Sequence, residues 1–207
     1  MLTKDILKKS GINQKWYEVL SKSFDKYHIC KSDNKEENIN ELAMFLAQCG
    51  HESINFTKLE ENLNYSANTL LKIFPKYFKD INEAREVVSK GKEAIANRIY
   101  GGRLGNGKNE GYKYRGRGII QLTGKNNYKK YGEKLGINLV DNPDLASSEL
   151  IASNIACCYW IERGLQPFAR KGDVKTVTKM INGGYNGLED REKRFKNILK
   201  ILEAVND

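Results

Sequence analysis

The 207-residue sequence has no long apolar run, only three prolines and only two histidines. No stretch reaches the ~18 apolar residues that a membrane-spanning helix needs, so we expect no stable membrane insertion. The scarcity of proline leaves most of the chain free to form uninterrupted helices. With only His28 and His51, the sequence offers little material for a zinc site or for a nucleophile activated by histidine.

The sequence also lacks a secretory signal and a disulfide framework. Residues 1–5 have no apolar core, so we expect synthesis in a cytoplasm without a signal peptide, and export by another route. The cysteines show no C-x-x-C spacing, and two of them are adjacent, which is a poor arrangement for disulfides. We expect four free thiols that act as small core residues, namely Cys30, Cys49, Cys157 and Cys158.

Charge of one sign predominates. The chain has 35 Lys and Arg against 26 Asp and Glu, a net charge of +9. Such a surface attracts polyanions such as nucleic acid, anionic lipid or an anionic cell wall, although it can also serve solubility alone. The basic residues are spread along the chain without a basic tail, which argues against a nucleic-acid partner.

Composition and periodicity predict a mainly α-helical protein. Hydrophobic residues make up 40% of the chain and charged residues 29%, as in a soluble globular domain. The length fits one domain over residues 1–207, and monomer is the default state. Apolar residues recurring at three and four predict helices over 3–9, 13–28, 36–52, 66–73, 81–88, 91–100, 124–135, 147–163, 172–181 and 189–204. Turns are expected at Asn142-Pro143 and from Gly164 to Pro167.

The segment 36–52 carries the clearest helical pattern. Asn34, with Glu37 three residues later, predicts an N-terminal cap. Ile39, Leu42, Ala43, Leu46 and Cys49 form one apolar stripe, and Glu52 falls on its edge. A half-buried carboxyl group in that position is expected to have a raised pKa.

Two near-matches to known motifs fail. Residues 102–109 approach the phosphate-binding pattern G-x-x-x-x-G-K-[ST], but Asn109 replaces the Ser or Thr, and a helix rather than a strand is expected before it. His51-Glu52 opens a zinc-protease H-E-x-x-H pattern, but Asn55 replaces the second histidine. His51 is therefore either a hydrogen-bonding partner near a site or a structural histidine.

Glu52 and Glu61 form a candidate acid/base pair. Cleaving a glycosidic bond with water requires two carboxyl groups, one to protonate the leaving oxygen and one to act on water or the sugar cation. On one continuous helix, nine residues would separate them by ~13 Å and place them on opposite faces. The helix must therefore end near Glu52, and residues 53–56 must turn the chain.

Three further segments add polar groups suited to a sugar. Residues 114–124 combine glycines with a predicted short apolar strand and with polar groups, Gln121 and Thr123 among them. Asn182 precedes a double-glycine turn, and Tyr65 follows Glu61 with two asparagines between them. Between 101 and 118, seven glycines interleave with tyrosines and basic residues, which is typical of a functional loop.

Together these segments resemble family 19 glycoside hydrolases, which include plant-type chitinases and phage endolysins. The resemblance rests on Ala47-Gln48-Cys49-Gly50-His51-Glu52-Ser53, on Gly116-Arg117-Gly118-Ile119-Ile120-Gln121-Leu122-Thr123 and on Ile181-Asn182-Gly183-Gly184, and it covers roughly residues 36–204. Glu61-Asn62-Leu63-Asn64-Tyr65-Ser66-Ala67 and the short glutamate spacing are more similar to the endolysin branch. The chitinase disulfide pattern and an obvious chitin-binding module are missing.

The resemblance implies a two-lobed, lysozyme-like fold with a central sugar-binding cleft, no metal and no cofactor. Helices within residues 1–35 would pack on the core of a single catalytic domain without a separate wall-binding module. Glu52 would be the general acid, Glu61 the base that activates water, and Thr123 a holder of that water. Polar contacts to the sugar would come from Gln121 and Asn182, with Tyr65 and Asn127 as further candidates, and Arg191 would lie near the acid with His51.

The resulting hypothesis is an endolysin that hydrolyses β-1,4 bonds in peptidoglycan glycan strands by an inverting mechanism. It would act as a monomer after release from the cytoplasm by a separate pore-forming protein, with no nucleic-acid partner. A chitinase and a lytic transglycosylase are alternatives within the enzymes. Outside them stand a non-catalytic cell-wall-binding protein and a basic nucleic-acid-binding protein, which the set of Glu52, Glu61 and Thr123 disfavours.

Overall fold

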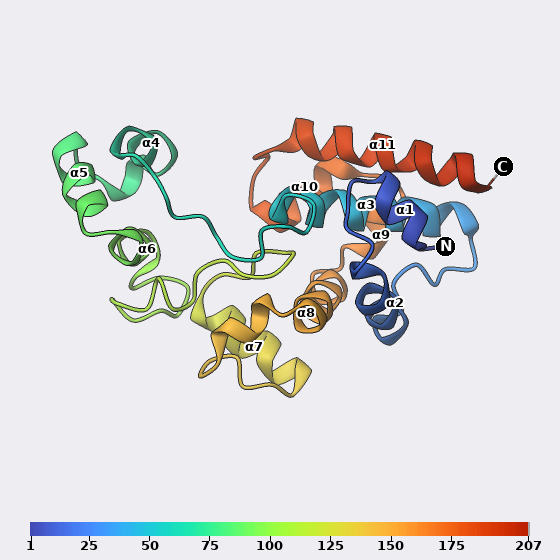
Figure 1. Ribbon diagram of the computed structural model, residues 1–207, viewed down its shortest axis with the longest axis horizontal. Helices are drawn as coiled ribbons and strands as arrows, with labels where there is room; N and C mark the ends of the chain where they lie inside the picture. Colours follow the sequence, from blue (N-terminus) through green and yellow to red (C-terminus); the bar gives the residue numbers. More distant parts are fainter. Residues whose placement is uncertain (207) are drawn as a thin grey trace. The chain divides into compact units, whose positions relative to one another are not determined.

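The computed structural model describes residues 1–206, with side chains through Val205, and is mainly helical, as predicted (Figure 1). Over this described part of the chain no β-strand occurs. The chain forms two compact units, which we describe separately. Unit 1 comprises Met1–Leu59, Gly118–Ile120 and the chain from Ala146 onward, and unit 2 comprises Glu60–Arg117 and Gln121–Leu145.

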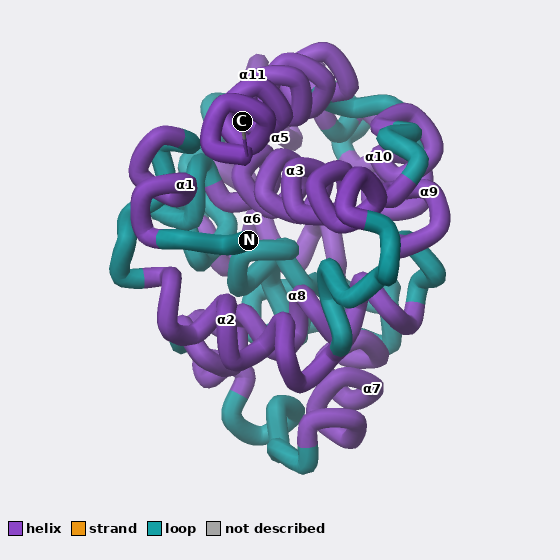
Figure 2. The backbone as a smooth tube through the Cα atoms, turned by 90° about the vertical axis from the view of Figure 1, so that its right-hand side faces the viewer, coloured by secondary structure: helices purple, strands orange, loops and turns teal. Residues whose placement is uncertain are grey.

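Unit 1 is built around the helix α3. Helix α11 and the short helix α9 pack on α3, and α2 packs on α8 (Figure 2). Aromatic edge contacts join these elements, since the ring of Phe45 lies 5.0 Å from Phe24 and 5.1 Å from Trp160. The helices of unit 1 are α1 Lys4–Lys9, α2 Trp16–Tyr27, α3 Lys35–Ser53, α8 Glu149–Glu162, α9 Gln166–Arg170, α10 Val174–Asn182 and α11 Leu188–Asn206.

The end of α3 confirms that the helix stops beside Glu52. After Ser53, the residues Ile54, Asn55 and Phe56 have φ angles of 50°, 52° and 65°, a left-handed run that costs side chains about 1 kcal/mol or more each. Buried contacts offset this cost. The Ser53 hydroxyl accepts a hydrogen bond from the Phe56 N–H at 3.0 Å, and the Phe56 ring packs on Trp16. Asn34 caps the other end of α3 as predicted, accepting from two backbone N–H groups.

Unit 2 holds a second, smaller core. Its helices are α4 Ala67–Ile73, α5 Ile81–Ser89, α6 Lys92–Tyr100 and α7 Lys125–Leu135, with the single 3-10 turn η1 Pro75–Tyr77. A further 3-10 helix, η2 Pro143–Ser147, leads out of unit 2. Helices α4, α5 and α6 gather around what we call the α4–α6 cluster, whose buried members are Leu63, Leu70, Phe78, Ala84, Ile95, Ala96 and Ile99.

One local prediction was wrong, and a second was right only in part. The short strand predicted within 114–124 does not form, and residues 118–121 make a tight turn instead. Arg117 and Leu122 exchange backbone hydrogen bonds of 3.1 and 2.8 Å across this turn, and Gln121 adopts a φ of 53°. The turn expected from Gly164 to Pro167 is present at Gly164, which has a φ of 63°, but Gln166 and Pro167 already belong to α9. Pro167 lies in the first turn of that helix, where its missing N–H costs nothing. The predicted helices are confirmed, with ends that differ from the predicted ones by three residues at most.

The four cysteines are thiols and form no disulfide, as predicted. Burial raises the pKa of the Cys30, Cys49 and Cys157 thiols well above the ordinary value, so these groups remain protonated. None of the helices within residues 1–206 combines the length and the apolar character needed to cross a bilayer.

Candidate active site

Glu52 lies in the last turn of α3 and is held by a buried cation. The Arg191 side chain is 1% exposed and donates to Glu52 Oε1 at 2.5 Å, while the Glu52 side chain is 18% exposed. Arg191 comes from the first turn of α11, and α11 packs along α3. A guanidinium in this position compensates the negative charge of the carboxylate with a short, charge-assisted hydrogen bond.

Gln48 joins this pair to a third helix. It precedes Glu52 by one turn of α3, and its side-chain oxygen accepts from Arg191 at 2.5 Å. Its amide nitrogen donates to the Thr178 hydroxyl on α10 at 3.1 Å. Gln48 is fully buried, so the network fixes the orientation of Arg191 through helices on both sides.

A second polar network lies beside the first. His51 Nδ1 is 2.7 Å from Asp190 Oδ2, and Arg194 donates to the same carboxylate oxygen at 2.6 Å. Burial raises the pKa of Asp190, but the hydrogen bonds from Arg194 and His51 outweigh it and leave the pKa lowered. Only glycine fits at Gly187, because a Cβ there would meet the His51 ring.

Asn182 is the last residue of α10, as the double-glycine turn predicted. Gly183 ends the helix in the left-handed conformation with φ 77°, and its N–H donates to the Lys179 carbonyl at 2.9 Å. The side chain of Asn182 is exposed and stands one turn beyond Thr178. The turn thereby leaves the amide open to solvent at the helix end.

In unit 2, Glu61 is held by neutral donors. Its backbone N–H donates to the Gly116 carbonyl at 2.9 Å, which ties the extended segment after Leu59 to the glycine-rich loop. Its carboxylate receives the Tyr100 hydroxyl on Oε1 at 2.7 Å and the Gly116 N–H on Oε2 at 3.1 Å. Each carboxylate oxygen therefore has one fixed donor.

Gly116 brings three predicted site residues together. A Cβ built on this glycine would lie 2.9 Å from Gln121 Oε1, 3.3 Å from Thr123 Oγ1 and 3.4 Å from Glu61 Cβ. The missing side chain is what allows these groups to converge. The Thr123 hydroxyl donates to the Gln121 carbonyl at 2.9 Å, so its oxygen lone pairs are directed elsewhere.

The two remaining candidates in unit 2 have structural contacts as well. Asn127 donates from its side chain to the Thr123 carbonyl at 2.8 Å and so ties the loop to α7. The Tyr65 ring packs edge-on against Phe74 with centroids 5.8 Å apart. Burial, followed by the charge of Glu61, raises the pKa of Tyr65.

The predicted residues thus form two groups, each within one unit. Unit 1 contains Glu52, Arg191, His51 and Asn182, and unit 2 contains Glu61, Thr123, Gln121, Tyr65 and Asn127. Sequence reasoning missed Gln48, Tyr100, Gly116 and Asp190 as partners of the carboxylates and of His51. Gln48 could have been found, because it is a polar residue one turn before Glu52 on a mostly apolar helix. Tyr100 gave no such signal, since 39 residues separate it from Glu61.

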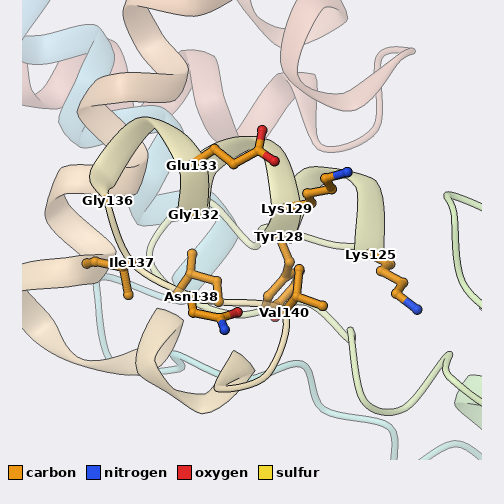
Figure 3. Close-up of a pocket in the computed structure, with 10 residues that line it drawn as sticks. Lys125, Tyr128, Lys129, Gly132, Glu133, Gly136, Ile137, Asn138 and Val140 are labelled. Carbon is orange, nitrogen blue, oxygen red and sulfur yellow. The ribbon is translucent and has the colours of Figure 1, made fainter.

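A cavity of about 590 Å³ beside α7 contains none of these residues (Figure 3). Its lining comes from one face of α7, including Tyr128 and Gly132, and from the loop through Val140. The Tyr128 hydroxyl donates to the Arg115 carbonyl at 2.6 Å, so this side chain serves the fold. Among the described residues, no three His, Cys, Asp or Glu side chains are grouped as a metal ion would require.

Comparison with known proteins assigns the chain to a family. A family model described as chitinase class I matches residues 92–178. A glycosyl hydrolase family 19 domain-containing protein from Haemophilus influenzae is 44% identical over 165 residues, covering 78% of this chain and 80% of the relative. The chain therefore belongs to glycosyl hydrolase family 19 and is a glycoside hydrolase.

More distant relatives agree with this class. Chitinase 8 of Oryza sativa subsp. japonica is 49% identical over 49 residues, which cover 23% of this chain and only 19% of that protein. The crystal structure of a bacterial family 19 chitinase matches with a TM-score of 0.64 and 22% identity, covering 96% of this chain and 94% of the other. Chitinase C from Streptomyces griseus matches with a TM-score of 0.62 and 23% identity, covering 90% and 84%. Because both identities are below 25%, these two matches show that the fold is shared with this chain and carry no conclusion about activity.

Proposed function

We propose that this family 19 glycoside hydrolase is an endolysin that cleaves β-1,4 glycosidic bonds in bacterial peptidoglycan, with inversion at the reacting carbon. The observation that carries the catalytic part is that the two candidate carboxylates, Glu52 and Glu61, each have fixed partners of a different kind. Inverting hydrolysis divides the work between an acid and a base in the same way.

Glu52 is proposed as the general acid, which gives its proton to the leaving oxygen. It becomes a carboxylate in that step, and the Arg191 guanidinium at 2.5 Å stabilises the charge that appears. Glu61 is proposed as the base that takes a proton from water. Thr123, which lies with Glu61 around Gly116, would help to hold that water through its hydroxyl oxygen.

Two features favour peptidoglycan as the substrate. The segment 61–67 and the short Glu52–Glu61 spacing resemble the endolysin branch more than plant-type chitinases. The net charge of +9 suits an anionic wall, and unit 2 carries most of it, with 16 Lys and Arg against 10 Asp and Glu. We further propose that the protein works as a monomer on the wall after release from the cytoplasm.

A chitinase is the second candidate, because several of the relatives and structures that match are named chitinases. Both substrates contain β-1,4-linked acetamido sugars, so the amides of Gln121 and Asn182 suit either. Peptidoglycan differs by the lactyl and peptide groups on alternate sugars, and the two polymers can therefore be separated by their products. One relative is named an inactive chitinase-like protein, so turnover has to be measured directly.

The test compares wild type with Glu52→Gln on purified peptidoglycan and on chitin oligosaccharides, with mass spectrometry of the products. We expect wild type to release peptidoglycan fragments with reducing ends, and Glu52→Gln to lose at least ~10³-fold in kcat because amide nitrogen cannot supply the proton. Circular dichroism and thermal melting check that the variant is folded. Anhydro-sugar ends would instead identify a lytic transglycosylase.

Other outcomes assign the other functions. Turnover of chitin without turnover of the wall would establish the chitinase. Wall binding without bond cleavage would leave a non-catalytic binding protein. If folded Glu52→Gln clears peptidoglycan at the wild-type rate, the catalytic assignment is wrong.

A further inference from the structure

We propose that Tyr100 is a positioning residue for Glu61, and that the α4–α6 cluster is the support that makes this positioning rigid. The inference rests on the proposed role of Glu61 as the base. It starts from a single contact, the hydrogen bond of 2.7 Å that the Tyr100 hydroxyl donates to Glu61 Oε1. The Gly116 N–H holds Oε2 at 3.1 Å, so the carboxylate is fixed at both oxygens.

Tyr100 can act only as a donor in this contact. Burial, followed by the charge of Glu61 and the hydrogen bond itself, raises the pKa of Tyr100 far above its ordinary value. The nearby Tyr65 also raises this pKa, and Arg103 lowers it. Arg103 is occupied elsewhere, because its guanidinium lies 4.7 Å from the centre of the Tyr77 ring and donates to the Ile99 carbonyl at 2.8 Å.

The backbone of Tyr100 is itself held in place. Tyr100 is the last residue of α6, and its carbonyl accepts from the Asn106 side chain at 3.0 Å. The Asn106 oxygen in turn accepts from the Lys125 N–H at the start of α7, at 2.8 Å. This chain of contacts links the phenol to two helices of unit 2.

Both ends of the Tyr100–Glu61 hydrogen bond are anchored in the same core. The Tyr100 ring packs against the α4–α6 cluster, and Leu63, two residues after Glu61, is a buried member of it. A group carried by one rigid core keeps its geometry better than a group at the end of a free loop. The cluster therefore has a role in orienting the base as well as in stability.

A neutral donor suits a base for a chemical reason. A water-activating carboxylate has to be ionised and must keep a lone pair available for the proton it takes. A phenol fixes the direction of the carboxylate without adding a positive charge that would compete for that lone pair. Misplacement of a reacting group by about 1 Å can cost on the order of 100-fold in rate.

The test is Tyr100→Phe, which removes one oxygen atom and keeps the ring in the cluster. We expect kcat on the substrate that wild type cleaves to fall by roughly 10- to 100-fold with KM little changed. The acidic limb of the kcat profile should move to higher pH, since the ionised base loses a donor that favours it. A purely structural role would not move this limb.

Tyr77→Phe is the matched control, because Tyr77 packs against the same cluster and its hydroxyl has no role at Glu61. It should keep the wild-type rate and pH profile. Should Tyr100→Phe fail to fold, Asn106→Ala tests the same link, since it removes the side-chain donor to the Tyr100 carbonyl and keeps the phenol. That carbonyl then accepts only from the Arg103 N–H at 3.2 Å. A smaller loss of kcat is expected for it.

The outcomes separate this inference from the proposed function. If wild type cleaves and Glu61→Gln does not, while Tyr100→Phe keeps the wild-type kcat and pH profile, the positioning role is overturned and the proposed function stands. If folded Glu61→Gln cleaves at the wild-type rate, the proposed role of Glu61 fails, whatever Tyr100→Phe does.

Discussion

The two candidate carboxylates are held by opposite means. Glu52 in unit 1 faces a buried cation, Arg191, which Gln48 orients from inside the helix packing. Glu61 in unit 2 faces a phenol and a backbone N–H, both neutral. The difference matches the two proposed roles, because an acid gains negative charge as it reacts, whereas a base starts with it and loses it.

The structural elements that carry the two carboxylates also differ. Glu52 extends from α3, a helix of 19 residues that is buried along most of its length. Glu61 lies outside any helix and depends on the α4–α6 cluster and the glycine-rich loop for its position. We infer that unit 1 fixes its carboxylate by burial and a buried cation. Unit 2 fixes its carboxylate by neutral hydrogen bonds and close packing.

Arg191→Met should break the unit 1 arrangement and give the largest effect. It leaves Glu52 and Gln48 without their shared partner, and removing one member of a buried ion pair costs roughly 3–5 kcal/mol. Partial exposure of Glu52 favours the lower end of this range. Urea denaturation measures the loss, and kcat should fall with it.

Arg191→Lys is the matched control for that variant. It keeps the charge but has one nitrogen in place of the two that donate to Gln48 and Glu52, so it should recover only part of the stability. By contrast, Tyr100→Phe in unit 2 should cost only about 1 kcal/mol. Equal losses for Arg191→Met and Tyr100→Phe would contradict the contrast between the two carboxylates.

Much of unit 1 could be predicted from the sequence because its signals are local. The apolar stripe over 36–52 follows helical periodicity, and the N-terminal cap can be predicted from the single residue Asn34. The need for α3 to end near Glu52 followed from helix geometry alone. Ser53 supplies the hydroxyl that stabilises the turn, which explains why that prediction was confirmed.

The parts that failed depend on contacts distant in sequence. The stretch Ile119-Ile120-Gln121-Leu122 is largely apolar and resembles a strand, but it has no partner strand among the described residues, and Arg117 pairs with Leu122 across a turn instead. Tyr100 reaches Glu61 only because α6 folds onto the α4–α6 cluster. Local patterns contain no information about such pairings, whereas the family resemblance pointed to residues without describing what holds them.

Alkaline pH should lower the stability of unit 1 more than that of unit 2. All four cysteines belong to unit 1, and three have raised pKa values from burial. Below pH ~8.5 these thiols are protonated in both the folded and the unfolded chain, so they do not affect the balance. Above it only the unfolded chain releases the protons, and stability should fall by roughly 1 kcal/mol per thiol at pH 9.5.

Urea midpoints at pH 7.5 and 9.5 measure this fall, and hydrogen exchange corrected for its intrinsic rate locates it. Unit 1 should lose protection first, because the buried Tyr100 and Tyr128 of unit 2 titrate only near pH 10 or higher once unfolded. A Cys49→Ala, Cys157→Ala double variant should show a shallower fall. An unchanged slope in that variant would place the alkaline effect elsewhere.

Gly116→Ala should test the unit 2 arrangement with only a small effect on stability. The added methyl would press on Gln121 Oε1 at 2.9 Å, on Thr123 Oγ1 at 3.3 Å and on Glu61 Cβ at 3.4 Å. Because the tightest contact is the end of a flexible side chain, we expect a stability loss of about 1 kcal/mol, at the low end for overpacking. The rate should fall more than 10-fold, since these groups have to keep their positions relative to one another.

Gly184→Ala, where the nearest atom is 3.8 Å away, is the control and should leave the urea midpoint unchanged. If Gly116→Ala lowered stability strongly but left kcat intact, Gly116 would serve the packing of the loop, and shape would not be what orients the base.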